Sequence, residues 1–313
     1  MRSKIGIGLC VLGVLLAIFG IIWITVVWPN LTKVPADLEQ QVDLQGTVNL
    51  YDSELGTPVA FDVIGHRKYT AFKASSRILY LYEDLWFEIA DTDPPQEVEQ
   101  LREHYQLGID RVTRQHLGGR GAGLSGGHYS FPFSVSKNKV YLWWNERNPE
   151  NLDCIYKDTI EFEGIEVYIF EMSTPEDGLT TPGSFDIPEM RIDQKVTLYV
   201  EPVSGVTVYF ESTTKRSGQI PQPDPLYPAT GPMTYKDVTF YEDSLSFTQD
   251  TIDDLVGQAK SAKTQVALGK NLLPWLCIGG GIVLVAVGIF LALRKTSQVT
   301  PPEPQAAGGS QPS

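Results

Sequence analysis

Apolar residues are concentrated near the two ends of the chain, in two uncharged runs that flank a long polar segment. The first run, residues 5–28, contains 24 residues, and the second, residues 272–293, contains 22. As helices rising about 1.5 Å per residue, both are long enough to cross a bilayer. Helix is the structure expected for them, because a backbone in lipid must satisfy its polar groups within its own segment.

The charges beside these runs predict how the chain is oriented. Arg2 and Lys4 precede the first run, and Arg294 and Lys295 follow the second. Lys and Arg favour the cytoplasmic side, so we expect residues 1–4 and the Pro- and Gly-rich, disordered tail 294–313 to be cytoplasmic. The central segment is then expected outside the cytoplasmic (plasma) membrane. The first run exceeds the apolar core of a cleaved signal peptide, about 7–15 residues, which favours an uncleaved signal-anchor.

The central segment has the alternating pattern and turn signals of β-strands. Short strands are predicted at 47–51, 59–64 and 69–72, and a longer one, apolar on both faces, at 77–90. Hairpins are predicted where two such runs flank a turn: 129–135 with 140–145, 159–162 with 165–170, and 196–200 with 206–211. A further strand is expected at 233–241, after a proline-rich excursion at 219–232 that is not expected to be a strand.

Two helices are expected to accompany these strands. The first, residues 95–104, begins at two prolines followed by acidic residues. The second, residues 249–271, has apolar residues at helical spacing, with Asp250 near its start and lysines later, which complements the helix dipole. The predicted fold is therefore α+β. A mainly antiparallel β ectodomain (29–248) and a membrane-proximal amphipathic helix (249–271) lie between the transmembrane helices 5–28 and 272–293.

The net charge and the cysteines exclude several classes of protein. The chain has a formal charge of −13, and residues 29–271, with 21 basic and 37 acidic residues, carry −16, which argues against nucleic-acid binding. Cys10 and Cys277 lie in the apolar runs, so Cys154 is the single cysteine of the central segment. We expect Cys154 to be a buried apolar thiol, and the domain to be held together by its core rather than by disulfides.

The motifs in the central segment do not predict a chemistry. The glycine-rich stretch 118–127 matches both the G-x-G-x-x-G and the G-x-S-x-G patterns, but each pattern requires a following helix, and here a strand is predicted to follow. Neither metal-binding spacings nor paired C-x-x-C motifs occur, so no catalytic residue, metal ligand or cofactor is predicted. Asn30 begins a glycosylation sequon two residues beyond the first apolar run.

Aromatic residues gather in three of the predicted strands. They indicate an aromatic-rich core or, alternatively, a pocket for an acyl chain or another apolar ligand. The candidate ligand-binding residues are Tyr80, Tyr82, Trp86, Phe131, Phe133 and Trp143. Glycines in the apolar runs would allow close helix contacts, either between the two runs or in a homo-oligomer; they are Gly6, Gly8, Gly13, Gly20, Gly279, Gly280, Gly281 and Gly288.

Several phrases, in a fixed order between the two apolar runs, are shared with a known family. They are residues 108–113, 128–133 with Lys137, 141–144, 164–170 and 200–206. In these phrases the chain resembles a bacterial family of membrane proteins of unknown function named porin PorA. The resemblance implies no catalytic residues. By topology the chain is also similar to class B scavenger receptors, which hold a β-rich ectodomain between two terminal helices and handle lipids.

These observations together predict a non-enzymatic membrane protein of the cell envelope. Its extracytoplasmic domain would bind an apolar or lipid ligand, or a protein partner, beside the bilayer. One alternative is a porin-like or transport component. Another is an extracytoplasmic hydrolase whose site residues are dispersed along the chain, with His66, His104, His116 or His128 among them.

Overall fold

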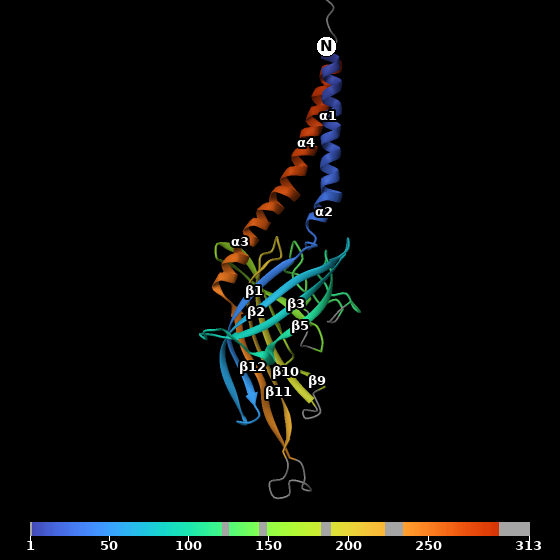
Figure 1. Ribbon diagram of the computed structural model, residues 1–313. Coiled ribbons are helices and arrows are strands. Elements are labelled where there is room, and N and C mark those ends of the chain that lie inside the picture. The colour runs from blue at the N-terminus through green and yellow to red at the C-terminus, as the bar shows by residue number, and fades with distance from the viewer. Residues whose placement is uncertain (1, 121–124, 144–148, 183–188, 223–233, 294–313) are drawn as a thin grey trace, which may run out of the picture. The chain divides into compact units, whose positions relative to one another are not determined.

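A computed structural model describes residues 2–120, 125–143, 149–182, 189–222 and 234–293 (Figure 1). The chain divides into two compact units, which are described separately below. The helical unit comprises residues 1–29 and 268–313, and the β unit comprises residues 30–267.

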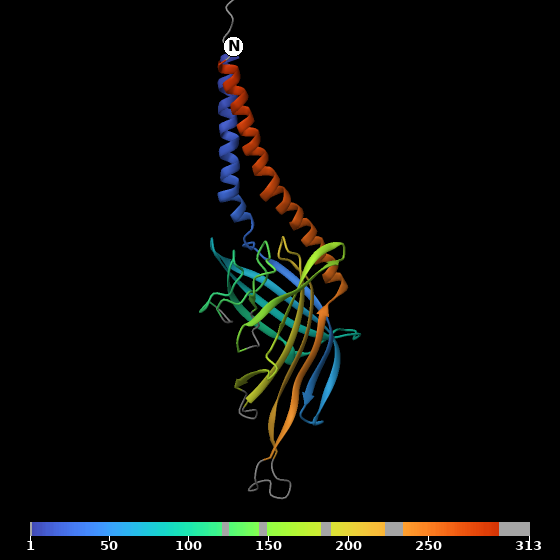
Figure 2. The ribbon, with the colours of Figure 1, turned by 180° about the vertical axis from the view of Figure 1, so that it is seen from behind.

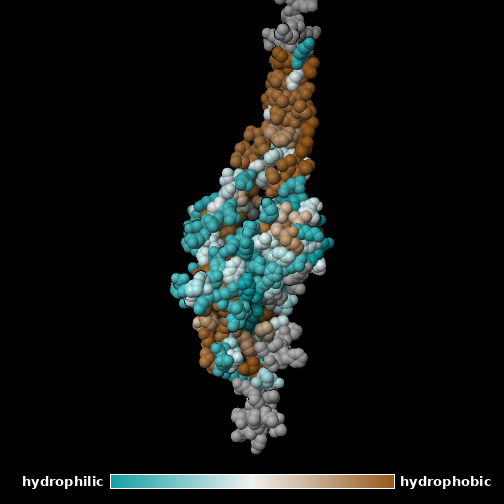
Figure 3. Space-filling view, viewed as in Figure 1, coloured by the Kyte–Doolittle hydropathy of each residue, from teal (hydrophilic) through white to brown (hydrophobic). Residues whose placement is uncertain are grey.

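The helical unit contains the two apolar helices that the sequence predicts. α1 (Arg2–Ile22) continues into η1 (Trp23–Val27) and α2 (Trp28–Leu31), and α4 (Leu273–Leu293) follows η3 (Ala267–Leu272). Both apolar helices are long enough to cross a membrane, and Figure 3 shows hydrophobic residues covering their surface. The expectation of two helices of membrane-spanning length and composition is confirmed.

Glycines bring α1 and α4 into backbone contact. A Cβ atom at Gly13 would lie 2.5 Å from the carbonyl oxygen of Gly281, and one at Gly6 would lie 2.7 Å from the carbonyl oxygen of Gly288. Gly20 meets Pro274 in the same way, so the contact recurs every seven residues between antiparallel helices. The remaining glycines predicted for helix contacts, which have open space around them, are Gly8, Gly279 and Gly280.

The β unit is built on a large antiparallel sheet (Figures 1 and 2). Its strands are β1 (Glu39–Asp52), β2 (Thr57–Ala74), β3 (Ile78–Ile89), β4 (Gln96–Glu97), β5 (Glu103–Asp110), β6 (Tyr141–Trp143), β7 (Leu152–Phe162), β8 (Ile165–Ser173), β9 (Leu179–Pro182), β10 (Glu189–Val200), β11 (Thr207–Gln222) and β12 (Thr234–Phe247). The strand order is β4-β3-β2-β1-β12-β11-β10-β8-β7-β6, with β5 also beside β3 and β9 also beside β10. The predicted α+β, mainly antiparallel fold is confirmed.

The two edges of this sheet are linked to each other. Single β-bridges join Ile109 of β5 to His116, Gln115 to His128, and His128 to Trp143 of β6. The sheet is also strongly twisted, and Figures 1 and 2 show β2 and β3 running obliquely across the direction of β10 and β11. The sheet is therefore curved and has a concave inner face.

One helix, α3 (Gln249–Val266), packs against the β unit. The hydroxyl oxygen of Thr248 caps it by accepting a hydrogen bond from the backbone N–H of Thr251. Ile252, Leu255, Val256 and Ala259 lie on one side of α3 and pack with buried residues of β1, β8 and β11. The opposite and flanking positions of the helix stay exposed.

Two of the predicted hairpins are confirmed. β7 and β8 pair across Glu163 and Gly164, both with positive φ (48° and 76°), and β10 pairs with β11 across residues 201–206. The runs 59–64 and 69–72 belong to the single strand β2 rather than to two strands. Residues 219–222 of the proline-rich stretch extend β11, contrary to the prediction, because they pair with β12; residues 223–232 lie outside the described ones.

Two further local predictions are wrong. The helix predicted at 95–104 is replaced by β4, a 3-10 turn (Glu99–Leu101) and the start of β5, because pairing with β3 overrides the local helix signals. Residues 129–135 are irregular rather than a strand. The backbone N–H groups of Ser134 and Val135 donate to the carbonyls of Val203 and Pro202, in the loop between β10 and β11. Tertiary contacts therefore determine the backbone conformation of both segments.

Candidate ligand-binding cavity

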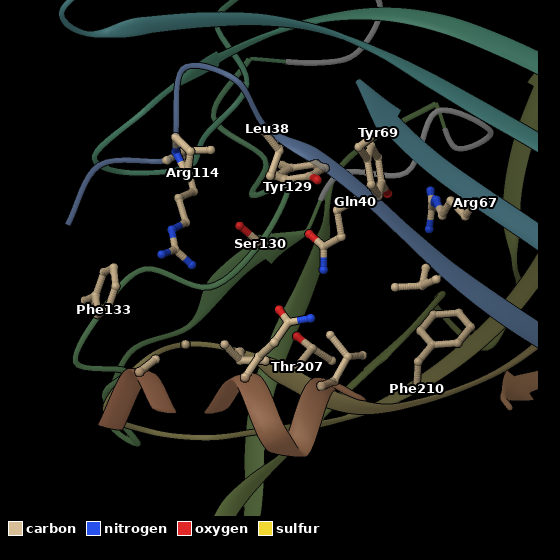
Figure 4. A pocket seen from close by; sticks show the side chains of 18 of the residues that line it. Leu38, Gln40, Arg67, Tyr69, Arg114, Tyr129, Ser130, Phe133, Thr207 and Phe210 are labelled. Carbon is tan, nitrogen blue, oxygen red and sulfur yellow. The ribbon is translucent and has the colours of Figure 1, made fainter. Parts of the chain in front are cut away.

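The inner face of the β unit borders a cavity of about 730 Å³ (Figure 4). Strands β1, β2, β3 and β11 supply one wall and α3 supplies another. Residues within 31–38, before β1, and within 129–133 contribute further to the lining, as does Arg114. The volume is within the range of about 300–1,000 Å³ typical of small-molecule sites.

Strand periodicity determines which side chains of β1 to β3 line the cavity. Alternate residues of a strand share one face, and Gln40, Val42 and Leu44 of β1 face inward. Tyr69 pairs with Gln40 across the β1–β2 ladder, and Glu83 pairs with Tyr69 across the β2–β3 ladder, so these side chains share the same face. The inner wall is consequently apolar at Val42 and Leu44 of β1 and polar at Gln40 and where β2 meets β3.

Irregular segments are held against the cavity by backbone hydrogen bonds. The N–H of Val34 donates to the carbonyl of Arg111 at 2.9 Å, and Nε of Arg111 donates back to the carbonyl of Val34 at 2.7 Å. The N–H of Tyr129 donates to the carbonyl of Arg114, also at 2.9 Å. These bonds place Val34 and Tyr129 in the lining although neither lies in a strand.

Gly205 makes a close backbone approach at the cavity. Its φ is +73°, which glycine adopts without a steric penalty. A Cβ atom at Gly205 would lie 2.4 Å from the carbonyl oxygen of Pro132 and 2.6 Å from that of Phe131. Only glycine therefore lets the loop between β10 and β11 approach residues 131–133 this closely.

An ion pair with a buried carboxylate lies in the polar part of the wall. Nε of Arg67 is 2.5 Å from Oε1 of Glu83, and the hydroxyl of Tyr69 donates to the same oxygen at 3.3 Å. Glu83 is only 1% exposed, so its carboxylate neutralises Arg67 in a region of low dielectric. Tyr129 packs edge-on against Tyr69, and burial raises the pKa of its phenol.

Arg114 is the second arginine of the lining, and it has a different environment. Its Nη1 donates to the carbonyl oxygen of Phe131, and its guanidinium carbon lies 4.9 Å from the centroid of the Phe133 ring. Among the described residues, Nε of Arg114 has no hydrogen-bond partner and no carboxylate forms an ion pair with the side chain. Burial lowers its pKa to about 10, which leaves the guanidinium charged at neutral pH.

The predicted aromatic site residues divide between two faces of the sheet. Phe133 and Trp143 line the cavity, and Phe131 is fully buried in the cluster beside them. The other three lie on the outer face of β3. There Tyr80 accepts a hydrogen bond from Arg120, Tyr82 stacks on Phe72 at 4.3 Å, and Trp86 stacks on His66 at 4.9 Å.

The charged residues of the cavity were not found by sequence reasoning. Arg114, Arg67 and Glu83 lie in no recognisable motif, and their partners are distant in the sequence. The alternation of β3 could have indicated Glu83, because it is the one charged residue among the apolar positions 79, 81, 85 and 87. No comparable signal indicates Arg114.

Comparisons with known proteins identify a family and give weak structural matches. No curated protein matches the chain. A crystal structure of a DUF1329 family protein from Desulfovibrio piger aligns with 76% of this chain and 90% of its own, at 10% identity and a TM-score of 0.19, a likeness too low to support any conclusion. The model of the family described as Porin PorA matches residues 5–290, which take in both apolar helices and the β unit between them, so the chain belongs to the porin PorA family.

Proposed function

We propose that the β unit is a non-enzymatic binding domain that holds an amphipathic ligand, such as a lipid, in the cavity. The cavity itself carries this proposal. Its volume of about 730 Å³ suits one small ligand, and its apolar lining suits a hydrocarbon chain. Binding is favoured over hydrolysis because, among the described lining residues, Glu83 is the single carboxylate and is already paired with Arg67.

Photolabelling of the full chain in lipid nanodiscs tests the binding function. The probe is monopalmitoylglycerol with a diazirine in its acyl chain, and labelled peptides are identified by mass spectrometry. We expect label on peptides that contain cavity residues, such as Phe133, Phe210 or Leu255. Label confined to α1 and α4 would contradict the proposal, because those helices contact any membrane lipid.

A pair of variants on α3 shows whether the label reports the cavity. Gly257 lines the cavity, and a Cβ atom there meets no other atom within 4 Å, so Gly257→Trp extends into open space. We expect it to lower cavity labelling several-fold. Thr264→Trp, at an exposed position of α3 outside the lining, is the control and should leave labelling unchanged. Equal labelling of the two variants would count against the cavity as the binding site.

We further propose that α1 and α4 anchor the protein in the cytoplasmic membrane, with both termini inside and the β unit outside. The basic residues that flank the apolar runs support this orientation. An amine reagent that does not cross membranes, applied to intact cells, should then modify exposed lysines of the β unit such as Lys73 and Lys215. It should spare Lys4 and Lys295, and the reverse pattern would exclude this orientation.

Pore formation is the second candidate, and the family name supports it. A pore of oligomerised helices needs polar groups along its lumen, whereas the sequence of α4 contains no charged residue. Conductance of the intact protein in planar bilayers tests this alternative. Reproducible channels abolished by Gly257→Trp, but not by Thr264→Trp, would connect the cavity to transport rather than to storage of a ligand.

A further inference from the structure

We propose that Arg114 gives the cavity a preference for anionic amphiphiles, whose carboxylate or phosphate head it binds while the hydrocarbon occupies the apolar part. This inference rests on the proposed binding function of the cavity and adds the charge of the ligand. It follows from three features of Arg114: its uncompensated charge, its backbone conformation and its place among the lining residues.

The charge of Arg114 has no counterion in the described part of the chain. Arg67, the other arginine of the lining, is neutralised by Glu83. Arg114 instead has one hydrogen bond to a carbonyl, a contact with the Phe133 ring and an unpartnered Nε. A partly buried cation without a counterion is destabilising, whereas an anion brought by a ligand forms charge-assisted hydrogen bonds with a guanidinium.

The backbone at Arg114 indicates that the side chain itself is needed there. Its φ is +61°, a left-handed conformation that glycine adopts more easily than a residue with a Cβ atom. Asp110 stabilises this turn: its Oδ1 accepts from the N–H groups of Val112 and Thr113 at 2.8 and 3.0 Å. Its backbone carbonyl accepts from the N–H of Arg114 at 2.8 Å. Strained residues of this kind are concentrated at ligand-binding sites.

The charges of the lining contrast with those of the β unit around it. Residues 29–271 carry −16, but the described lining contains three cations (Lys33, Arg67 and Arg114) and one carboxylate, Glu83. The cavity is thus locally positive within a strongly acidic domain. Because water is partly excluded there, the attraction of a bound anion to Arg114 is stronger than it would be on the surface.

Arg114 lies across the cavity from part of the apolar lining. Figure 4 shows the Arg114 guanidinium extending into the space between Phe133 and Ser130, with Phe210 at the far side. Val42, Phe210 and Phe247 supply apolar surface to the lining, and Arg67, which is neutralised by Glu83, lies on the same side as Phe210. A ligand with a charge at one end and hydrocarbon at the other fits this arrangement better than an inorganic anion or a neutral hydrocarbon does.

A matched pair of photoprobes tests the inference with the full chain in phosphatidylcholine nanodiscs at pH 7. One probe is the diazirine-bearing monopalmitoylglycerol, and the other is its phosphate ester, a lysophosphatidic acid with the same chain. We expect the phosphate ester to label cavity peptides at about tenfold lower concentration, which corresponds to one charge-assisted interaction. Arg114→Gln should abolish this preference, so that the two probes label the variant at the same concentration, whereas Arg114→Lys should retain part of it.

The control variant is Arg102→Gln, which removes an exposed arginine, ion-paired with Glu97, outside the cavity lining. It should keep the full preference. A preference reduced equally by Arg102→Gln and Arg114→Gln would reflect net charge and overturn the inference. An excess of inorganic phosphate that displaces the lysophosphatidic acid probe would also overturn it, because the site would then bind a free anion rather than an amphiphile.

The outcomes separate this inference from the function on which it rests. Equal labelling of the cavity by both probes in the wild-type protein overturns the role of Arg114 but preserves the binding function. Absence of cavity labelling by either probe overturns the binding function itself. If thermal unfolding shows that Arg114→Gln does not fold, the preference in the wild-type protein and its partial retention in Arg114→Lys still decide the question.

Discussion

Glu83 and Arg67 form an ion pair inside the β unit, although their strands bring them together from positions sixteen residues apart. Oε1 of Glu83 lies 2.5 Å from Nε of Arg67, and the carboxylate is almost fully shielded from solvent while the guanidinium is 28% exposed. The pair therefore holds the charged side chain of Arg67 in place in the cavity wall. It also distinguishes Arg67, which has a counterion, from Arg114.

Removing one member of this pair should destabilise the β unit. Glu83→Ala leaves Arg67 without its counterion, and we expect a loss of about 3 kcal/mol in the free energy of unfolding. The double variant Glu83→Leu with Arg67→Met should lose less than the sum of the single variants, because neither charge remains. Urea unfolding of the full chain in detergent, followed by tryptophan fluorescence, measures this, and strict additivity would contradict it.

The close approach at Gly205 predicts a large effect of one methyl group. Gly205→Ala combines an unfavourable positive φ with a collision against the carbonyls of Pro132 and Phe131, so we expect a loss of more than about 2 kcal/mol. Gly56→Ala is the control, since Gly56 has a similar φ of +66° and open space around it. It should lose only about 1 kcal/mol. Equal losses in thermal or urea unfolding would show that the contact contributes nothing.

The glycine contact between α1 and α4 predicts a position-dependent effect in the helical unit. Gly13→Leu would push against the backbone of Gly281 and separate the helices, whereas Gly8→Leu faces open space. Cys10, whose thiol contacts the carbonyl of Val285, reports the separation. We expect maleimide to modify Cys10 several-fold faster in Gly13→Leu than in the wild-type protein or in Gly8→Leu. An unchanged rate in Gly13→Leu would argue against this packing.

Cys154 should be unreactive in the folded protein. It is fully buried in the cluster that includes Phe131, Tyr141 and Phe170, as expected from the sequence, and burial raises the pKa of its thiol to about 12. Because the thiolate is the reactive form, maleimide or iodoacetamide should leave Cys154 unmodified up to about pH 9 and modify it after unfolding in guanidinium. Mass spectrometry of the peptide that contains Cys154 measures this, and modification without unfolding would show that the cluster is open.

Local patterns in the sequence were sufficient where an element depends on its own residues. The uncharged runs at the two ends predict helices because length and apolar character alone make a segment compatible with lipid. The β7–β8 hairpin was predicted because Glu163 and Gly164 form a tight turn between two β-prone runs. The buried state of Cys154 likewise follows from an apolar residue type within a predicted β domain.

Contacts between distant residues decided the rest. Residues 95–104 have local helix signals but form strand and turn, because β5 completes the edge of β3. The glycines of the apolar runs are a second example. Their positions in the sequence allow contacts either within the chain or with a second copy, and the register of α1 against α4 shows that Gly6, Gly13 and Gly20 contact α4. Aromatic clustering indicated Phe133 and Trp143 as candidates, but it could not separate them from Tyr80 and Tyr82 on the outer face, because the face depends on sheet curvature.

The sequence by itself thus determined the two apolar helices, the antiparallel β class and the acidic character of the segment between the helices, all of which depend on composition and short-range periodicity. Only the tertiary structure decided that a cavity exists and that Arg114 lies in it beside Phe133, with no carboxylate partner among the described residues. The physical reason is that the cavity and its charge balance arise from side chains of β1, β2, β3, β11 and α3 together. No local sequence pattern predicts which of these side chains come into contact.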